Sequence, residues 1–434
     1  MTLSPAPLRL GLAGLGTVGG GLMRLLAANA PLITARAGRP ILVTAVSARD
    51  RARDRGFSLD HVTWHQNPLD LVTDPEVDLI VELIGGAGNP ARALVQAALA
   101  ARKPVVTANK ALLAEHGRSL AALAATHNAP LAYEAAVAGG IPIIKALREG
   151  LAGNQLTAIS GILNGTCNYI LTTMRERGSP FAEILAEAQR LGYAETDPSA
   201  DIDGLDTAHK LAILAALAFG QPVDLAAVHV EGIRAIDALD IAYATELGYR
   251  IKLLGIARLI DGKIEARVHP TMLPTEAPLA MVEGVYNAVL AVGDQVGRVL
   301  LEGRGAGAGP TASAVVADLI DIARNRLTPV WGYDALANLT ATPPAPIGAH
   351  VGPYYLRLMV ADQPGVIADI TAGLRDNGVS LEAMLQRGRS RNAAVPVVLV
   401  THETPEHAMR AAVSQIQKLP TVLETPTVIR IEPG

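Results

Sequence analysis

The chain has 434 residues, a formal net charge of -4 and a hydrophobic fraction of 50%, with only 3% aromatic residues. This length exceeds what one hydrophobic core usually serves, so roughly two or three domains are expected. The small net charge, with no block of like charges, argues against nucleic acid or an anionic membrane surface as a partner. The most apolar stretch, residues 211–219, is far shorter than the roughly 20 residues that span a bilayer.

Cysteine usage indicates a reducing compartment. Cys167 is the single cysteine, which excludes an internal disulfide framework and a multi-cysteine zinc site and is typical of a cytoplasmic protein. We interpret it as a small buried hydrophobic residue, with a catalytic thiol as the alternative. Residues 8–13 could pass for a weak signal segment, but they run directly into glycines without a cleavage region, so we expect a strand there.

The first part of the chain alternates apolar runs with helical patterns. Residues 8–14 and then 18–28 predict a strand, a turn and a helix. The later apolar runs are typical of parallel strands that helices cover on both faces. Strands are predicted at 41–46, 78–84, 104–108 and 130–134, and helices at 90–101 and 110–126. Residues 1–142 are therefore predicted to form a doubly wound α/β Rossmann domain.

The pattern changes after Pro142. A helix is predicted over 204–219 and strands over 252–260 and 263–269, so we expect residues 143–305 to form an α+β domain for catalysis, substrate binding and dimerisation. The glycine-rich residues 303–309 precede Pro310, which is expected at the first position of a helix that runs to 324. We expect a helix within residues 306–340 to pack back on the first domain and complete it.

Proline and alanine crowd between residues 342 and 353, which is typical of a linker, here placed at 341–353. Residues 354–434 then show strands at 354–361, 379–386, 395–401 and 428–432 and helices at 366–377 and 405–419. This βαββαβ order predicts a ferredoxin-like unit.

Three glycines follow the first predicted strand. Gly14, Gly16 and Gly19 form a G-x-G-x-x-G turn, with Thr17 and Val18 between the last two. The first glycine permits the bend, the second lets a pyrophosphate approach the backbone, and the third lets the helix lie close to the strand. The helix N-terminus supplies N–H groups for the anion. This context predicts a dinucleotide site, and the alternative is a glycine-rich turn without a ligand.

The end of the second predicted strand indicates which dinucleotide binds. An acidic residue there receives the ribose 2'-hydroxyl, whereas arginine suits a 2'-phosphate. No acid occupies this strand tip, and Arg49 follows it. The sequence therefore favours NADP(H) over NAD(H). The alternative is that Arg49 and Arg51 are solvated loop charges.

Ionisable side chains concentrate in residues 192–210. Asp206 and Lys210 lie four apart on a predicted helix, so the carboxylate can orient the ammonium group. Glu195 precedes this helix in a loop. A lysine held near carboxylates in a cleft can protonate the oxygen that becomes an alkoxide when a carbonyl is reduced by hydride. The alternative is a surface ion pair with no catalytic role.

A second lysine, Lys110, directly follows the predicted strand 104–108. Ligands bind at the carboxyl ends of strands in open parallel sheets, so we expect Lys110 and Thr107 at the cofactor or the substrate. A lysine that is merely solvated in the first helical turn is a less favourable alternative, because a cation there opposes the helix dipole.

These residues carry a resemblance to a known family. The chain resembles homoserine dehydrogenases over nearly all of residues 1–340, in the stretches 14–19, 105–110, 133–142, 161–169, 192–210 and 305–315. The resemblance implies reversible reduction of L-aspartate 4-semialdehyde to L-homoserine with NADP(H), or also NAD(H), in threonine, methionine and isoleucine biosynthesis. It also implies a homodimer or homotetramer.

The resemblance assigns roles by position. Lys210 is expected to be the proton donor and Asp206 its neighbour at the substrate. Glu195 is expected to bind the substrate amino group, and Lys110 to complete the site beside the nicotinamide. Two glycines are expected to approach the cofactor through their backbones, Gly192 and Gly309.

The resemblance further implies a monovalent cation, usually sodium, near the domain junction. Glu134 matches the side-chain ligand, and Val137, Gly139 and Ile141 match the backbone carbonyl ligands. Oxygen ligands suit a hard cation. The alternative is a plain strand-to-helix turn.

The C-terminal unit resembles an ACT domain through residues 362–366 and 377–378. This resemblance implies an amino-acid ligand at an interface between subunits, for which threonine is the expected candidate. The alternative is a dimerisation module without a ligand.

Two other functions compete with this one. An aspartate-semialdehyde dehydrogenase needs a thiol nucleophile, which Cys167 could supply, but no comparable histidine constellation is found. A redox-sensing module that binds NADPH without turnover has no need of Lys110, Asp206 and Lys210 at the nicotinamide. Turnover with aspartate semialdehyde distinguishes these functions.

Overall fold

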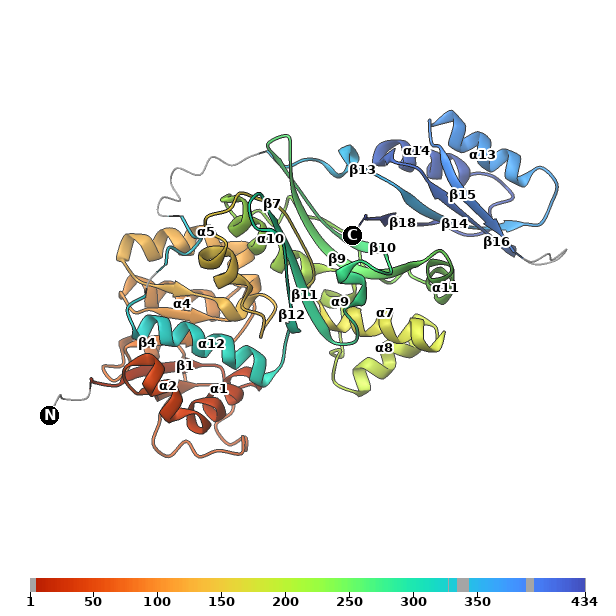
Figure 1. The fold of residues 1–434 in the computed structure, drawn as a ribbon. Helices are drawn as coiled ribbons and strands as arrows, with labels where there is room; N and C mark the ends of the chain where they lie inside the picture. Colours follow the sequence, from red (N-terminus) through yellow and green to blue (C-terminus); the bar gives the residue numbers. More distant parts are fainter. Residues whose placement is uncertain (1–4, 327, 334–342, 388–393, 434) are drawn as a thin grey trace.

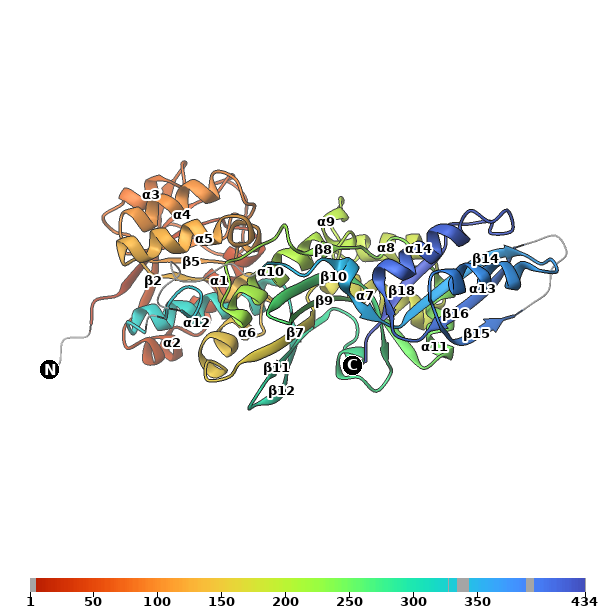
Figure 2. The same cartoon turned by 90° about the horizontal axis from the view of Figure 1, so that it is seen from above.

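A computed structural model describes residues 5–326, 328–333, 343–387 and 394–433 of the chain. Figure 1 shows an N-terminal unit, a central unit and a C-terminal unit, and Figure 2 shows that the first and last lie at opposite ends of an elongated molecule. Residues 327 and 334–340 of the segment expected to complete the first domain, residues 341 and 342 of the expected linker, and residues 388–393 and 434 of the expected C-terminal domain lie outside the described part. No helix in the described ranges is long and apolar enough to cross a membrane.

A six-stranded sheet forms the centre of the N-terminal unit. Its strands are all parallel and follow the order β3-β2-β1-β4-β5-β6. The order reverses between β1 and β4, and ligands bind in the crevice at such a switch point. The prediction of a doubly wound α/β unit is therefore confirmed. The strands are β1 (Leu8–Ala13), β2 (Ile41–Ser47), β3 (Thr63–His65), β4 (Leu79–Glu82), β5 (Val105–Thr107) and β6 (Leu131–Ala132).

Helices cover both faces of this sheet, which explains why β4 and β5 are buried along their whole length. They are α1 (Thr17–Ala28), α2 (Ala30–Ala37), α3 (Asp70–Thr73), α4 (Ala91–Ala100) and α5 (Lys110–His127). A late segment, α12 (Ala308–Ala323), lies beside α1 and joins the same core (Figure 1). A Cβ at Gly21 of α1 would lie 2.4 Å from the carbonyl oxygen of Ala308, so glycine permits this close approach.

The start of α12 differs from the prediction. Pro310 is its third residue, not its first, because the helix begins at Ala308 after Gly307. Proline is tolerated here because none of the N–H groups in the first helical turn has an intrahelical partner.

A mixed sheet forms the central unit, with the order β12-β11-β7-β9-β10. Its strands are β7 (Leu156–Ile162), β9 (Tyr249–Ile260), β10 (Lys263–Pro274), β11 (Tyr286–Gly293) and β12 (Gly297–Arg304), and the two-residue β8 (His229–Val230) pairs with β10. Its helices are α6 (Ile143–Lys145), α7 (Gly165–Arg177), α8 (Phe181–Arg190), α9 (Ser199–Ile202), α10 (Leu205–Phe219) and α11 (Ala238–Glu246). The α10 helix packs on β7, β9 and β10 and is buried along most of its length.

The prediction that β10 ends at residue 269 is wrong, because the strand continues to Pro274. Its pairing with β9 is unbroken, from Lys263 opposite Ile260 to Pro274 opposite Tyr249. Prolines at 270 and 274 hide this continuation in the sequence because proline removes a ladder donor and indicates a strand end.

The C-terminal unit has the strand order β18-β14-β16-β15, with two helices on one face of the sheet (Figure 1). This is the predicted ferredoxin-like arrangement. Its elements are β14 (Tyr354–Ala361), α13 (Val366–Asp376), β15 (Leu381–Gln386), β16 (Ala394–Thr401), α14 (Glu406–Ile416) and β18 (Thr427–Ile431), with β13 (Val351–Gly352) paired to β17 (Thr404–Pro405) beside them. The described part of the expected linker is anchored, since Pro344 bridges to Ile264.

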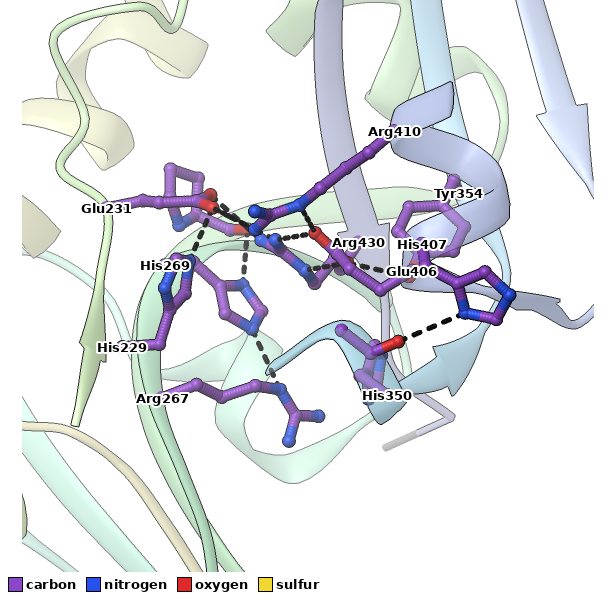
Figure 3. Close-up of polar contacts among 12 residues, drawn as sticks. His229, Glu231, Arg267, His269, His350, Tyr354, Glu406, His407, Arg410 and Arg430 are labelled. Atoms are coloured by element: carbon purple, nitrogen blue, oxygen red, sulfur yellow. Dashed lines mark hydrogen bonds and ion pairs between the residues drawn. The ribbon is translucent and has the colours of Figure 1, made fainter. Parts of the chain in front are cut away.

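The central and C-terminal sheets are continuous. Strand β18 pairs in parallel with β10, with Thr271 opposite Arg430 and Met272 opposite Ile431. Charged side chains fill the junction beside this pairing. Arg430 lies between Glu231 and Glu406, and its guanidinium donates to both oxygens of each carboxylate at 2.7–2.9 Å (Figure 3). The C-terminal unit is thus tied to the central unit by backbone and side chains together.

Candidate active site

A cleft of about 630 Å³ opens at the carboxyl ends of the parallel strands, and Gly14, Gly16 and Arg49 are among the residues that line it. Gly14 has φ +101°, and a Cβ there would lie 2.5 Å from the carbonyl oxygen of Leu83. A Cβ at Gly19 would lie 2.1 Å from the carbonyl oxygen of Gly14, whereas one at Gly16 would meet nothing within 4 Å. Two glycines thus permit close packing, and the third leaves room for a ligand.

The start of α1 offers backbone donors to this cleft. Thr17 and Val18 are its first two residues, and the preceding Gly16 has no side chain to cap them. The first N–H groups of a helix lack intrahelical partners and favour an anion. The turn therefore has the geometry of a pyrophosphate site.

Further arginines line the cleft besides Arg49. Arg53 and Arg55 are among its lining residues, and the Arg55 guanidinium donates to the carbonyl oxygens of Arg53, at 2.7 Å, and Asp50, at 2.5 Å. The guanidinium carbon of Arg55 lies 5.8 Å from the centroid of the Trp64 ring. Arg55 therefore holds the loop after β2, and Arg49 and Arg53 remain exposed. The sequence reasoning missed Arg53 and Arg55, although the basic run from 49 to 55 was visible.

A buried network sets the start of α5. Glu82, at the end of β4, accepts hydrogen bonds from the backbone N–H groups of Ile84 and Gly85 and, at 2.6 Å, from the Thr107 hydroxyl. Thr107 Oγ1 in turn accepts from the N–H of Asn109, the N-cap of α5. The Thr107 hydroxyl is thus engaged within the protein, and the network places Lys110 at the first position of α5.

Lys110 and α10 meet at Asp206. Lys110 Nζ lies 3.1 Å from Asp206 Oδ1, and Lys210 Nζ lies 2.7 Å from Asp206 Oδ2. Lys210 Nζ also donates to the Leu163 carbonyl oxygen at 2.6 Å. Asp206 and Lys210 are 7% and 9% exposed, so this is not a surface ion pair. The structure confirms the contact between Asp206 and Lys210 that their spacing predicted, and it brings Lys110, which the sequence marked separately, to the same carboxylate.

The electrostatics of this cluster keep Asp206 charged. Burial raises the pKa of Asp206, but the positive charges of Lys210 and Lys110 and a hydrogen bond from Asn164 outweigh burial, so the net pKa lies well below its ordinary range. Burial raises the pKa of the neighbouring Asp201, and the charge of Asp206 raises it further. Sequence reasoning assigned no role to Asn164 or Asp201, although both lie in the stretches quoted for the family resemblance.

Glu195 and Gly192 lie on the exposed loop that connects α8 to α9. The Thr166 hydroxyl donates to the Tyr193 carbonyl oxygen at 2.7 Å, which ties this loop to the start of α7. The backbone carbonyl of Glu195 accepts from Gln189 Nε2 at 3.1 Å. Gly309, the second residue of α12, is also exposed, and a Cβ there would meet nothing within 4 Å.

One of the expected cation ligands, Glu134, is a buried carboxylate. Glu134 Oε1 accepts from the N–H of Ile144 and Oε2 from that of Lys145, at 2.9 and 2.8 Å. Burial is the main cause that raises the pKa of Glu134, and the negative charge of the nearby Asp318 adds to it, so the pKa lies at about 7. Gly139 has φ +48° and approaches Gly305 closely. Glu134 thus caps the start of α6, a role that its position in the sequence did not reveal.

The other two expected ligands flank this turn. Val137 is fully buried directly after the short helical turn Glu134–Ala136, and the Ile141 carbonyl oxygen accepts from the N–H of Ile143 at 2.7 Å. In the described ranges, no group of three or more histidine, cysteine, aspartate or glutamate side chains could hold a metal ion. A site built mainly from backbone carbonyls would not form such a group.

Cys167 is fully buried in α7, and its thiol donates to the Asp201 carbonyl oxygen at 3.2 Å. Burial raises the pKa of this thiol well above its ordinary value. A buried, protonated thiol is a poor nucleophile, which supports its interpretation as a packed hydrophobic residue.

A Rossmann cleft, together with a cluster in which the buried Asp206 pairs with the buried Lys210 and the half-buried Lys110, is typical of a nicotinamide-dependent oxidoreductase. Three family models match the chain: the NAD-binding domain of homoserine dehydrogenase over residues 14–134, homoserine dehydrogenase over 142–320 and the ACT domain over 354–421. The chain belongs to the homoserine dehydrogenase family and carries a C-terminal ACT domain.

Relatives match over almost the entire chain. A homoserine dehydrogenase of Neisseria gonorrhoeae is 47% identical, with 98% of this chain and 99% of that relative covered. The crystal structure of a homoserine dehydrogenase from Thiobacillus denitrificans is 48% identical, covers 99% of both chains and has a TM-score of 0.92. A hyperthermophilic archaeal homoserine dehydrogenase in complex with NADPH is 28% identical, covers 75% of this chain and all of its own, and has a TM-score of 0.63.

Proposed function

We propose that this enzyme reversibly reduces L-aspartate 4-semialdehyde to L-homoserine with NADP(H), with Lys210 as the proton donor. The placement of Lys210 carries the proposal. Two acceptors, Asp206 Oδ2 and the Leu163 carbonyl oxygen, hold its Nζ. An ammonium group has three protons, so one is left to point at a substrate oxygen.

NADPH, when bound, supplies the hydride that the carbonyl carbon accepts. Lys210 gives a proton to the carbonyl oxygen, which becomes the hydroxyl of homoserine, and the reverse reaction returns the proton to Lys210. Asp206 stays ionised and holds the ammonium group of Lys210 in place. Lys110, 39% exposed at its side chain, lies at the first turn of α5 and would complete the site beside the nicotinamide.

The remaining contacts of substrate and cofactor fall on the exposed elements. Glu195 would bind the substrate ammonium group through its carboxylate. Gly192, Gly309 and Thr107 would lie along the cofactor, as would the glycine turn. The exposed Arg49 favours a nucleotide with a 2'-phosphate, and the archaeal relative solved with NADPH agrees with this choice.

A monovalent cation, sodium in the first instance, would be held by the Glu134 carboxylate and the carbonyl oxygens of Val137, Gly139 and Ile141. The chemistry of the site suits a cation, because burial raises the pKa of both Glu134 and Asp318, and the charge of Asp318 raises that of Glu134 further. Lys145 Nζ lies 3.5 Å from Asp318 but also pairs with Asp321. One shared ammonium group leaves negative charge that a cation would offset.

We propose that an amino acid, threonine, controls this enzyme through its ACT domain and binds where two subunits of a homodimer or homotetramer meet. This would make the enzyme a cytoplasmic branch-point activity in threonine, methionine and isoleucine synthesis. The support is the matched ACT domain over residues 354–421.

The deciding experiment is a spectrophotometric assay of homoserine oxidation with NADP and with NAD, each with and without threonine. We expect turnover with homoserine, a higher kcat/KM with NADP, and inhibition by threonine. Binding of NADPH without turnover of either homoserine or aspartate semialdehyde would instead indicate a redox-sensing module. Equal turnover with and without threonine would remove the regulatory part of the proposal.

A further inference from the structure

Asn164 forms the centre of the hydrogen bonds around Asp206. It is 5% exposed and is the N-cap of α7, where its side-chain oxygen accepts from the N–H of Cys167 at 2.8 Å. Its single side-chain nitrogen donates to two different carboxylates, to Asp201 Oδ1 at 2.7 Å and to Asp206 Oδ2 at 2.9 Å. The amide oxygen and both protons of the amide nitrogen therefore each have a defined partner.

The capping role alone does not require asparagine. An N-cap needs only an oxygen acceptor, so serine or aspartate serves as well as asparagine. The NH₂ group is what distinguishes asparagine from these residues, and here it bridges the two acids. The bridge supplies two donors without supplying charge, so it joins two carboxylates that would otherwise repel each other in a buried site.

The same bridge leaves the lysines free for other partners. Asp206 Oδ2 accepts from Asn164 and from Lys210, while Asp206 Oδ1 pairs with Lys110. Without the amide, Asp206 and Asp201 would have to compete for the ammonium groups or take up a proton. Either change moves Lys210 relative to the position it now holds against the Leu163 carbonyl oxygen.

We propose that Asn164 is a positioning residue for the reduction, which acts by bridging Asp201 and Asp206 and thereby fixing the Asp206–Lys210 pair. This inference rests on the proposed function, because it concerns the geometry of the proton donor named there. Asn164 does not itself exchange the proton.

The test compares Asn164→Ser and Asn164→Asp with wild type and with Lys210→Ala. Both substitutions keep an N-cap acceptor and remove the bridging NH₂ group. Asn168→Ser is the matched control. Asn168 lies one turn further along α7 and is also buried. It donates to the carbonyl oxygens of Val282 and Tyr286 and accepts from Lys252 Nζ, and it has no contact with Asp201 or Asp206.

We expect Asn164→Ser to lower kcat by about 100-fold, the order that a small misplacement of a reacting group costs, with a far smaller change in KM. The affinity for NADPH, measured by fluorescence titration, should stay at the wild-type value because the glycine turn is untouched. Asn168→Ser should lower the melting temperature at least as much but keep kcat within severalfold of wild type.

Asn164→Asp has a distinctive pH profile. The introduced acid faces Asp201 and Asp206, with Lys210 and Lys110 beyond them, so its pKa is raised by the like charges and it keeps a proton at low pH. Protonated, it can donate to one neighbour; deprotonated, it cannot. We expect kcat to fall as the pH is raised from about 6 to about 9, with a descending limb that wild type lacks over this range.

Wild-type kcat and an unchanged pH profile in both Asn164 variants, together with an inactive Lys210→Ala, would overturn the positioning role and leave the proposed function standing. A loss in the Asn164 variants no greater than that of Asn168→Ser would overturn it too. Absence of homoserine turnover in wild type, or normal kcat in Lys210→Ala, would overturn the proposed function, and the inference with it.

Discussion

Two largely buried charge clusters of this molecule both pair cations with carboxylates, but they differ in which cation they use. At the junction with the ACT domain, Arg430 donates to both oxygens of Glu231 and both oxygens of Glu406, and the Tyr354 hydroxyl adds a further bond to Glu406 at 2.8 Å. At the candidate active site, the cations are lysines and the shared carboxylate is Asp206. In the first cluster all three guanidinium nitrogens of Arg430 donate to carboxylates, whereas in the second Lys210 uses two of its three protons on Asp206 and the Leu163 carbonyl oxygen.

The difference shows what each cation contributes. Arginine keeps its protons and fits carboxylates in pairs, so it suits a permanent joint between two units. Lysine is a compact charge that can give up a proton. The chemistry of arginine therefore suits a structural joint at the junction, and the chemistry of lysine suits the proton transfer that we propose for the α10 cluster. Substitutions that exchange these properties test the comparison.

Lys210→Ala should lower kcat by about three orders of magnitude, because it removes the general acid, with far less effect on KM. Lys210→Arg is the sharper variant, since arginine keeps the charge beside Asp206 but does not release a proton near neutral pH. Steady-state kinetics with homoserine and NADP measure both. Near-normal kcat in Lys210→Arg would show that charge alone is needed and would remove the proton-donor role.

Arg430→Met should destabilise the junction by about 3 kcal/mol, because removing one partner leaves buried carboxylates unpaired. Hydrogen–deuterium exchange of β18 and α14 measures the effect locally, and kcat without effectors should stay close to wild type. Arg375→Met is the control, since Arg375 is 75% exposed and pairs with the adjacent Asp376. Equal exchange rates in the two variants would contradict the structural role of Arg430.

The junction should also weaken in acid. Arg267 Nε–H donates to His269 Nε2, and arginine cannot accept, so the neutral ring keeps its proton on Nδ1, which donates to the Pro270 carbonyl oxygen. Burial, with the positive charges of Arg430 and Arg267, lowers the pKa of His269 well below its ordinary value of 6.5. The negative charge of Glu231, which also faces this ring, raises the pKa of His269, but it does not outweigh burial and the two arginines.

Below pH 6.5 the unfolded chain therefore binds a proton that the folded chain does not, and stability is lost as the pH falls. The slope for one such group is at most about 1.4 kcal/mol per pH unit. Thermal unfolding of wild type between about pH 7 and pH 5 should show this loss, and His269→Gln should flatten it. The lowered pKa of Glu406 adds a further loss below its ordinary value of 4.5. An unchanged slope in His269→Gln would assign the acid sensitivity to other groups.

The parts of the fold that could be predicted are those that a local sequence pattern determines, and the parts that could not be predicted depend on contacts between distant residues. Five strands of the Rossmann sheet, β1, β2, β4, β5 and β6, could be predicted because helices cover both faces and leave apolar runs. Strand β3 was not predicted, because its three residues, Thr63–His65, are exposed or half-buried and form no apolar run. Strand β12 was not predicted, because its residues are exposed or half-buried and include arginine and glutamate, so they form no apolar run. The pairing of β18 with β10 was not predicted either, because no local pattern indicates which sheet edge a strand will join.

The candidate site shows the same limit. The pairing of Asp206 with Lys210 follows from their spacing of four residues on one helix, whereas the meeting of Lys110 with Asp206 joins elements almost a hundred positions apart. The bridge made by Asn164 was not predicted, because a residue that suits an N-cap already has a sufficient local explanation.

The smallest expected effect concerns an arginine that is exposed, unlike Arg430. Arg49→Ala should reduce the preference for NADP over NAD by about tenfold, the order of one charged hydrogen bond to a phosphate in contact with water. The measurement is the ratio of kcat/KM for the two cofactors, with Arg51→Ala as the control because Arg51 is exposed and is not among the residues lining the cleft. If Arg49→Ala keeps the wild-type ratio and an Arg53→Ala variant loses it, the 2'-phosphate contact belongs to Arg53, which lines the same cleft. Unlike the joint at Arg430, this contact should weaken as salt is added, because an exposed charge is screened and a buried one is not.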